Sequence, residues 1–201
     1  MFILCLGFFV YQFFITNYDQ FGIHFRFLTV WALTGALIIS GLLLTERIRG
    51  NIEKYHALSS IVSVLNAVVV FLYWKFFSID PALINAESIP WYQEYYLHVL
   101  GPFLVILDAI IINKSFQKHK QAIAGIILIC ILYVVWLEYI VSPLNELPLG
   151  SFAQGLPYPF LNDLQIKQRS IFYGTTIVIA VGFYLIGCIL MLIYSQIIKR
   201  R

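Results

Sequence analysis

Long apolar runs separated by short polar segments make up most of this chain. Each run approaches the roughly 20 residues that a helix needs to cross the hydrocarbon core of a bilayer. The pattern predicts about six transmembrane helices in one bundle, and it gives a single domain over residues 1–201 with no internal repeat. The predicted spans cover approximately residues 1–16, 26–45, 57–77, 94–113, 122–142 and 171–196.

The composition leads to the same class of protein. Hydrophobic residues make up 61% of the chain and charged residues 11%, and the mean hydropathy is +0.85. Ordinary soluble domains carry about 25% charged residues, so this composition cannot supply the surface of a soluble fold. We therefore predict an all-α integral membrane protein.

The basic residues are distributed unevenly between the two ends of the predicted spans. One end carries Arg47, Arg49, Lys54, Lys114, Lys118, Lys120, Lys199, Arg200 and Arg201. The other end carries only Arg26, Lys75, Lys167 and Arg169. Since Lys and Arg are enriched in cytoplasmic connections, both termini are predicted to be cytoplasmic. The net charge of +3 is dispersed over these positions, so no nucleic-acid-binding face is expected.

The sequence contains no pattern typical of a metal site, a nucleotide-binding site or a disulfide framework. The three cysteines, Cys5, Cys130 and Cys188, lie within predicted spans, and their spacing fits neither a zinc site nor a disulfide framework. No HExxH, P-loop, GxSxG or Rossmann glycine pattern occurs. We predict no metal and no cofactor.

A hydroxyl and an imidazole are predicted to lie at the same depth of the bilayer. Thr29 is three residues beyond Arg26, or about 5 Å, and His98 is four residues beyond Glu94, or about 6 Å. Both spans enter from the same side, so the two side chains share one layer. A nucleophile beside a general base is the arrangement needed for acyl transfer. The structural alternative is a threonine bonded to its own helix and a histidine that anchors the interface.

Other polar groups in and near the predicted spans are candidates for substrate binding. Asp108 and Asn66 share a greater depth and are expected to form a hydrogen bond with each other. Glu94 lies one turn before His98 and could orient its imidazole, or it could be a solvated interfacial acid. Tyr95 and Tyr158, with backbone amides, are the candidate oxyanion donors.

Several ordered segments resemble the androgen-induced gene family, which includes the androgen-dependent TFPI-regulating protein. Phe25 to Thr29 is similar to the Trp-Lys-Phe-Leu-Thr segment of that family. Further similar segments are Trp74 with Asp80, Ile89-Pro90 before the His98 helix, Tyr158 to Leu161, Arg169 to Thr176, and Phe183 to Gly187. The similarity extends over about residues 21–190. It departs from the better-known animal members in one place, because Pro102 follows His98 by four residues instead of five.

The resemblance implies a multi-pass threonine hydrolase that cleaves fatty acid esters of hydroxy fatty acids. It assigns the nucleophile to Thr29 and the general base to His98. The leading hypothesis is thus a membrane-embedded lipid ester hydrolase with a lipid ester as its substrate, surrounded by membrane lipids. The alternative is a non-catalytic membrane protein that binds a lipid or a partner protein. A separation of more than about 6 Å between the two side chains, with no cavity, would make catalysis implausible.

Overall fold

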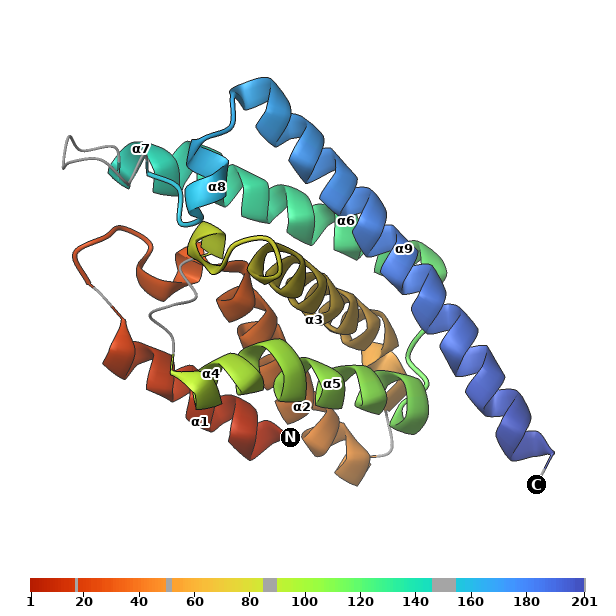
Figure 1. Ribbon diagram of the computed structural model, residues 1–201. Helices are drawn as coiled ribbons and strands as arrows, with labels where there is room; N and C mark the ends of the chain where they lie inside the picture. The colour runs from red at the N-terminus through yellow and green to blue at the C-terminus, as the bar shows by residue number, and fades with distance from the viewer. Residues whose placement is uncertain (17, 50–51, 85–89, 146–154, 201) are drawn as a thin grey trace.

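The computed structural model describes residues 1–16, 18–49, 52–84, 90–145 and 155–200, which fold into helices without any strand (Figure 1). The first four α-helices are α1 (Phe2–Ile15), α2 (Leu28–Arg49), α3 (His56–Phe77) and α4 (Trp91–Tyr95). They are followed by α5 (Gly101–Leu107), α6 (His119–Val135), α7 (Ser142–Asn145), α8 (Pro159–Asn162) and α9 (Ile166–Lys199). The predicted class, an all-α bundle, is confirmed.

Five helices of the described chain are long and apolar enough to cross a membrane. They cover Leu28–Arg47, His56–Phe77, Trp91–Ile112, His119–Asn145 and Ile166–Lys199. Two of them are composite, because π-helical turns join α4 to α5 and α6 to α7. The sixth, α1, has 14 residues and a length of about 21 Å, less than the roughly 30 Å of the hydrocarbon core. It packs beside α2 through Cys5 and completes the bundle.

Helix α3 lies at the centre of the bundle and contacts α2, α5, α6 and α9. Small residues allow this central position. Ser60 and Ser63 are fully buried, and their hydroxyl groups donate to the carbonyls of Ala57 and Ser59 on the same helix. Because these hydroxyls are satisfied within α3, neighbouring helices can approach closely without leaving polar groups unpaired.

Both chain ends lie toward the same end of the bundle, which also holds the connections α2–α3 and α5–α6 (Figure 1). With the short α1 counted, the described chain has six helical segments that alternate in direction, and an even number of them brings both chain ends to the same end. The opposite end, where α1 meets α2 and where α7 and α8 lie, carries the candidate site. Which end faces the cytoplasm remains the prediction made from the basic residues.

The last helix begins earlier than the sequence pattern indicated. It starts at Ile166 instead of residue 171, because Gln165 and Gln168 form a reciprocal capping box at its N-terminus. The polar residues 167–170 therefore extend the helix beyond its apolar part. Of the long connection before it, residues 146–154 lie outside the described chain. The segment Tyr158 to Leu161 packs back against the bundle, with Leu161 1% exposed.

Candidate active site

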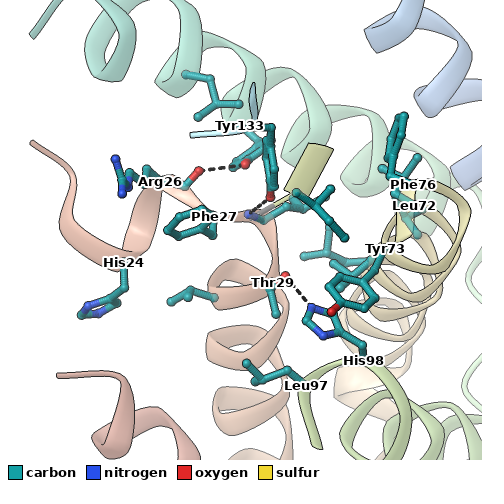
Figure 2. Close-up of a pocket in the computed structure, with 18 of the residues that line it drawn as sticks. His24, Arg26, Phe27, Thr29, Leu72, Tyr73, Phe76, Leu97, His98 and Tyr133 are labelled. Atoms are coloured by element: carbon teal, nitrogen blue, oxygen red, sulfur yellow. Dashed lines mark hydrogen bonds between the residues drawn. The ribbon is translucent and has the colours of Figure 1, made fainter. Parts of the chain in front are cut away.

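Thr29 and His98 are in direct contact. Thr29 is the second residue of α2, and His98 lies in the π-helical turn η5 (Tyr96–Leu100) between α4 and α5. Thr29 Oγ1 is 3.4 Å from His98 Nε2, as Figure 2 shows. This is a long hydrogen bond, of the kind that catalytic pairs show before substrate binds. The two residues, which were predicted to lie at the same depth, are therefore in contact. Their separation is well below the 6 Å above which catalysis would be implausible.

A proline and a tryptophan fix the backbone around the histidine. Pro102 has no N–H, so the carbonyl of His98, four residues earlier, loses its α-helical partner. Trp74 of α3 replaces that partner, because its indole Nε1 donates to the His98 carbonyl at 3.0 Å. The π turn adds to the local departure from α geometry, since Gly101 N–H donates to the carbonyl of Tyr96, five residues back. His98 thus faces Thr29 despite its shorter spacing to the proline.

The imidazole of His98 is covered on one face by an aromatic ring. Tyr73 of α3 stacks on it with a centroid separation of 3.5 Å and an interplanar angle of 8°. The Tyr73 hydroxyl donates to Glu94 Oε1 at 2.5 Å. Glu94 therefore holds the ring that packs on the histidine, and its side chain orients the imidazole through Tyr73.

The two nitrogens of His98 have different surroundings. Nδ1 is buried and makes no hydrogen bond within the described chain. When the imidazole carries its proton on Nδ1, Nε2 directs a lone pair toward Thr29. The side chain is only 3% exposed. The geometry suits a neutral histidine that can accept the proton of the Thr29 hydroxyl.

A cavity of about 660 Å³ opens beside the pair. Both Thr29 and His98 line it, together with residues from α1, α3, α4, α6, α8 and α9. One part of its wall is formed by apolar and aromatic side chains such as Leu72, Phe76 and Phe160. Cavities of this size and character hold small apolar or amphiphilic ligands.

Tyr158 reaches the start of α2 and lines the same cavity. Its hydroxyl accepts a hydrogen bond from Leu28 N–H at 3.0 Å, next to Thr29 in the sequence. Burial raises the pKa of Tyr158, so its own proton remains available for donation. The neighbouring carbonyls also matter here. The carbonyl of Arg26 accepts a hydrogen bond from Tyr133, and that of Phe25 accepts from two indoles. Within the described chain, Thr29 N–H makes no backbone hydrogen bond to either carbonyl.

The remaining predicted site residues lie off this cavity. Tyr95 is 58% exposed on the outside of α4. The expected hydrogen bond between Asp108 and Asn66 is wrong. Asp108 accepts from Asn113 Nδ2 on its own helix, because the π turn over Asp108–Ile112 brings Asn113 back to it. Asn66 donates to the carbonyls of Val62 and Ala32, at 2.9 and 3.4 Å.

Tyr73 and Trp74 are the site residues that sequence reasoning missed. In the sequence they belong to the aromatic end of an apolar span, and nothing in their spacing relates them to His98. Trp74 carried a signal only as part of the family resemblance. Their roles follow from the packing of α3 against the π turn.

Fold and site together define a polytopic helical membrane protein with a threonine–histidine pair on the wall of an internal cavity. The chain belongs to the FAR-17a/AIG1-like protein family, whose family model matches residues 1–191. It is also similar to a UPF0641 membrane protein of Schizosaccharomyces pombe, with 23% identity over 175 residues. That alignment covers 83% of this chain and 74% of the yeast protein. No solved structure matches the chain.

Proposed function

We propose that this protein is a lipid ester hydrolase that uses Thr29 as its nucleophile and His98 as its general base. The observation that carries the proposal is the 3.4 Å contact between Thr29 Oγ1 and His98 Nε2 on the wall of the cavity. A hydroxyl beside the ring nitrogen of an imidazole is the arrangement of an activated nucleophile. The same two residues are those that the family resemblance assigns to catalysis.

In the proposed reaction, His98 Nε2 accepts the Thr29 proton as Oγ1 attacks the ester carbonyl. The tetrahedral intermediate collapses, the bond to the alcohol oxygen breaks, and His98 returns the proton to the leaving alcohol. The acyl group is then an ester of Thr29. Water attacks this ester with His98 again as base, which releases the fatty acid and restores the Thr29 hydroxyl.

The negative charge on the carbonyl oxygen needs hydrogen-bond donors. The N–H of Thr29 lies in the first turn of α2, where N–H groups have no partner inside the helix. The positive end of the helix dipole adds to this effect. The Tyr158 hydroxyl, hydrogen-bonded to Leu28 N–H, is a second donor that lines the cavity. Both are proposed oxyanion donors, and the substrate class is a fatty acid ester of a hydroxy fatty acid or a related lipid ester.

The proposal is tested with purified full-length protein in detergent, a fluorophosphonate probe and a branched fatty acid ester. Wild type is compared with Thr29→Ala and His98→Ala. Thr34→Ala serves as the matched control, because Thr34 lies on the same helix and its hydroxyl bonds only to the carbonyl of Val30. We expect labelling and hydrolysis to be lost in the first two variants and kept in the control. Well-folded wild type that neither reacts nor hydrolyses would favour the lipid-binding alternative.

A further inference from the structure

Three buried polar side chains line the same cavity as the catalytic pair and lack hydrogen-bond partners. Gln12, His24 and Gln93 are 5%, 3% and 5% exposed. Within the described chain, Gln12 Nε2, His24 Nε2 and Gln93 Oε1 have no partner. A buried polar atom without a partner is unfavourable, and native proteins keep few of them. Three such atoms on the wall of one cavity indicate a binding site in which a ligand supplies the missing hydrogen bonds.

Contacts between their elements place these side chains together. Thr16 Oγ1 donates to the carbonyl of Gln12 at 2.6 Å and lies 3.3 Å from His24 Nδ1. The C-terminal turn of α1 is thus joined to the turn η1 (Ile23–Arg26). Next to Gln12 and Gln93, the hydroxyls of Tyr11 and Tyr92 are hydrogen-bonded at 2.6 Å, which joins α1 to α4. We call Gln12, His24 and Gln93 the polar cluster.

The polar cluster precedes the reacting groups along two segments of the chain. His24 precedes Thr29 by five residues, and Gln93 precedes His98 by five residues. Gln93 and His98 belong to one continuous helical segment, in which five residues correspond to about 7 Å. Between His24 and Thr29 the backbone is extended at Phe27. Figure 2 shows His24 on the side of Thr29 away from His98. A ligand with its ester carbonyl at Thr29 would reach the polar cluster through the cavity that all of these residues line.

The hydrogen-bonding character of the polar cluster is mixed. The single proton of Thr16 Oγ1 is used on the Gln12 carbonyl, so His24 must donate from Nδ1 to this oxygen. Neutral His24 then presents a lone pair at Nε2. Burial lowers the pKa of His24, which keeps it neutral at pH 7. The two glutamine amides supply donors and acceptors in either orientation.

We propose that the polar cluster binds an O–H group of a substrate whose ester carbonyl lies at Thr29 in the same cavity. The hydroxyl of a partial acylglycerol and the protonated carboxyl of an esterified hydroxy acid both have this chemistry, since each donates to the His24 lone pair and accepts from an amide. The acyl chain occupies the apolar part of the cavity, along Leu72 and Phe76. This assignment of substrate class rests on the proposed hydrolase function.

The test compares three oleoyl esters with full-length protein: monooleoylglycerol, an oleoyl ester of a hydroxy fatty acid, and ethyl oleate, which has no O–H group. Variants His24→Leu and Gln93→Leu are compared with Gln117→Leu, an exposed glutamine outside the cavity. Each cluster variant should reduce kcat/KM for an O–H ester about 3- to 10-fold, the effect of one lost neutral hydrogen bond. Hydrolysis of ethyl oleate and the behaviour of Gln117→Leu should not change. A preference for monooleoylglycerol or for the ester of the hydroxy fatty acid shows whether the bound O–H group belongs to a glycerol or to a carboxyl.

Binding of non-hydrolysable ethers separates this proposal from the hydrolase proposal. Octadecylglycerol ether should bind wild type more tightly than octadecyl ethyl ether, and the difference should disappear in both cluster variants. If the ethers behave in this way but no ester is hydrolysed, the hydrolase function fails and the polar cluster stands. Equal losses for ethyl oleate and the O–H esters would overturn the polar cluster. So would ether binding that does not depend on the hydroxyl groups in folded wild type.

Discussion

The ring of Tyr73 lies parallel to the imidazole of His98, with centroids 3.5 Å apart. Its hydroxyl is held by Glu94, which precedes His98 by one turn on the same helix. Tyr73 therefore fixes the plane of the imidazole without touching Thr29. In this arrangement α3, the central helix, supports the proposed base supplied by the fourth span.

Substitution of Tyr73 separates the stack from the hydrogen bond. Tyr73→Phe keeps the ring and loses the bond to Glu94, so we expect hydrolysis to fall only a few-fold. Tyr73→Leu removes the stack and allows the imidazole to turn, and a loss of about 100-fold is expected, as for small misplacements of catalytic groups. Measurements of kcat and KM across pH 6–9 check this prediction. A positioning role lowers kcat and leaves KM nearly unchanged. Equal activity of the two variants would contradict the role of the stack.

The hydrogen bond between Trp74 and the His98 carbonyl predicts that replacing Pro102 lowers activity. Pro102→Ala restores an N–H that competes for this carbonyl, which favours an α turn in place of the π turn and rotates His98 away from Thr29. We expect activity to fall at least about 10-fold while the Tm is unchanged or higher.

Trp74→Phe should have the opposite profile, because it leaves the carbonyl without its indole donor and destabilises the fold by about 1–3 kcal/mol. In the double variant the alanine N–H replaces the indole, so part of the lost stability should return. Thermal unfolding of all three variants in detergent measures this coupling. Strictly additive changes in stability would show that the two groups do not share the carbonyl.

Much of the fold could be predicted from the sequence, because apolar runs of bilayer length leave few alternatives to helices. Element boundaries were less accurate where a cap made of two glutamines extended α9. The π turns left no signal at all. One of them, over Asp108–Ile112, directs Asp108 to Asn113 and is the reason that the expected bond to Asn66 is absent.

The site was predictable only along single helices. Counting residues from the interface gives depth, and only this depth and the family resemblance related Thr29 to His98. Rotation about each helix axis and the neighbours of each face depend on packing between distant segments. The contact of Tyr73 with His98 and the convergence of Gln12 with His24 therefore required the structure.

The surroundings of His24 predict how stability depends on pH. Burial lowers the pKa of His24 below its usual value of about 6.5. The unfolded chain then binds a proton at His24 more readily than the folded chain. This contribution to stability is complete above about pH 6.5 and is lost as the pH falls toward the folded pKa. His24→Gln should flatten the fall in Tm between pH 7 and pH 5, and an unchanged slope would contradict it.

Two glycines of α9 form a matched pair for packing. A Cβ on Gly187 would collide with the ring of Phe116, which is 2% exposed. Gly187→Ala should therefore destabilise the protein by about 1–3 kcal/mol. At Gly182 a Cβ would meet nothing within 4 Å, so Gly182→Ala should leave the Tm unchanged or raise it. Similar Tm values for the two variants would contradict the close contact between α9 and Phe116.

Peptide mass spectrometry of the fluorophosphonate adduct tests the central claim most directly. The label should be found on Thr29 in wild type, and on residue 29 in Thr29→Ser, which keeps a hydroxyl 3.4 Å from His98 in the wild-type geometry. It should be absent from His98→Ala and retained by Thr34→Ala. A label on another residue of folded protein, or labelling of Thr29 that does not depend on His98, would contradict a threonine nucleophile activated by this histidine.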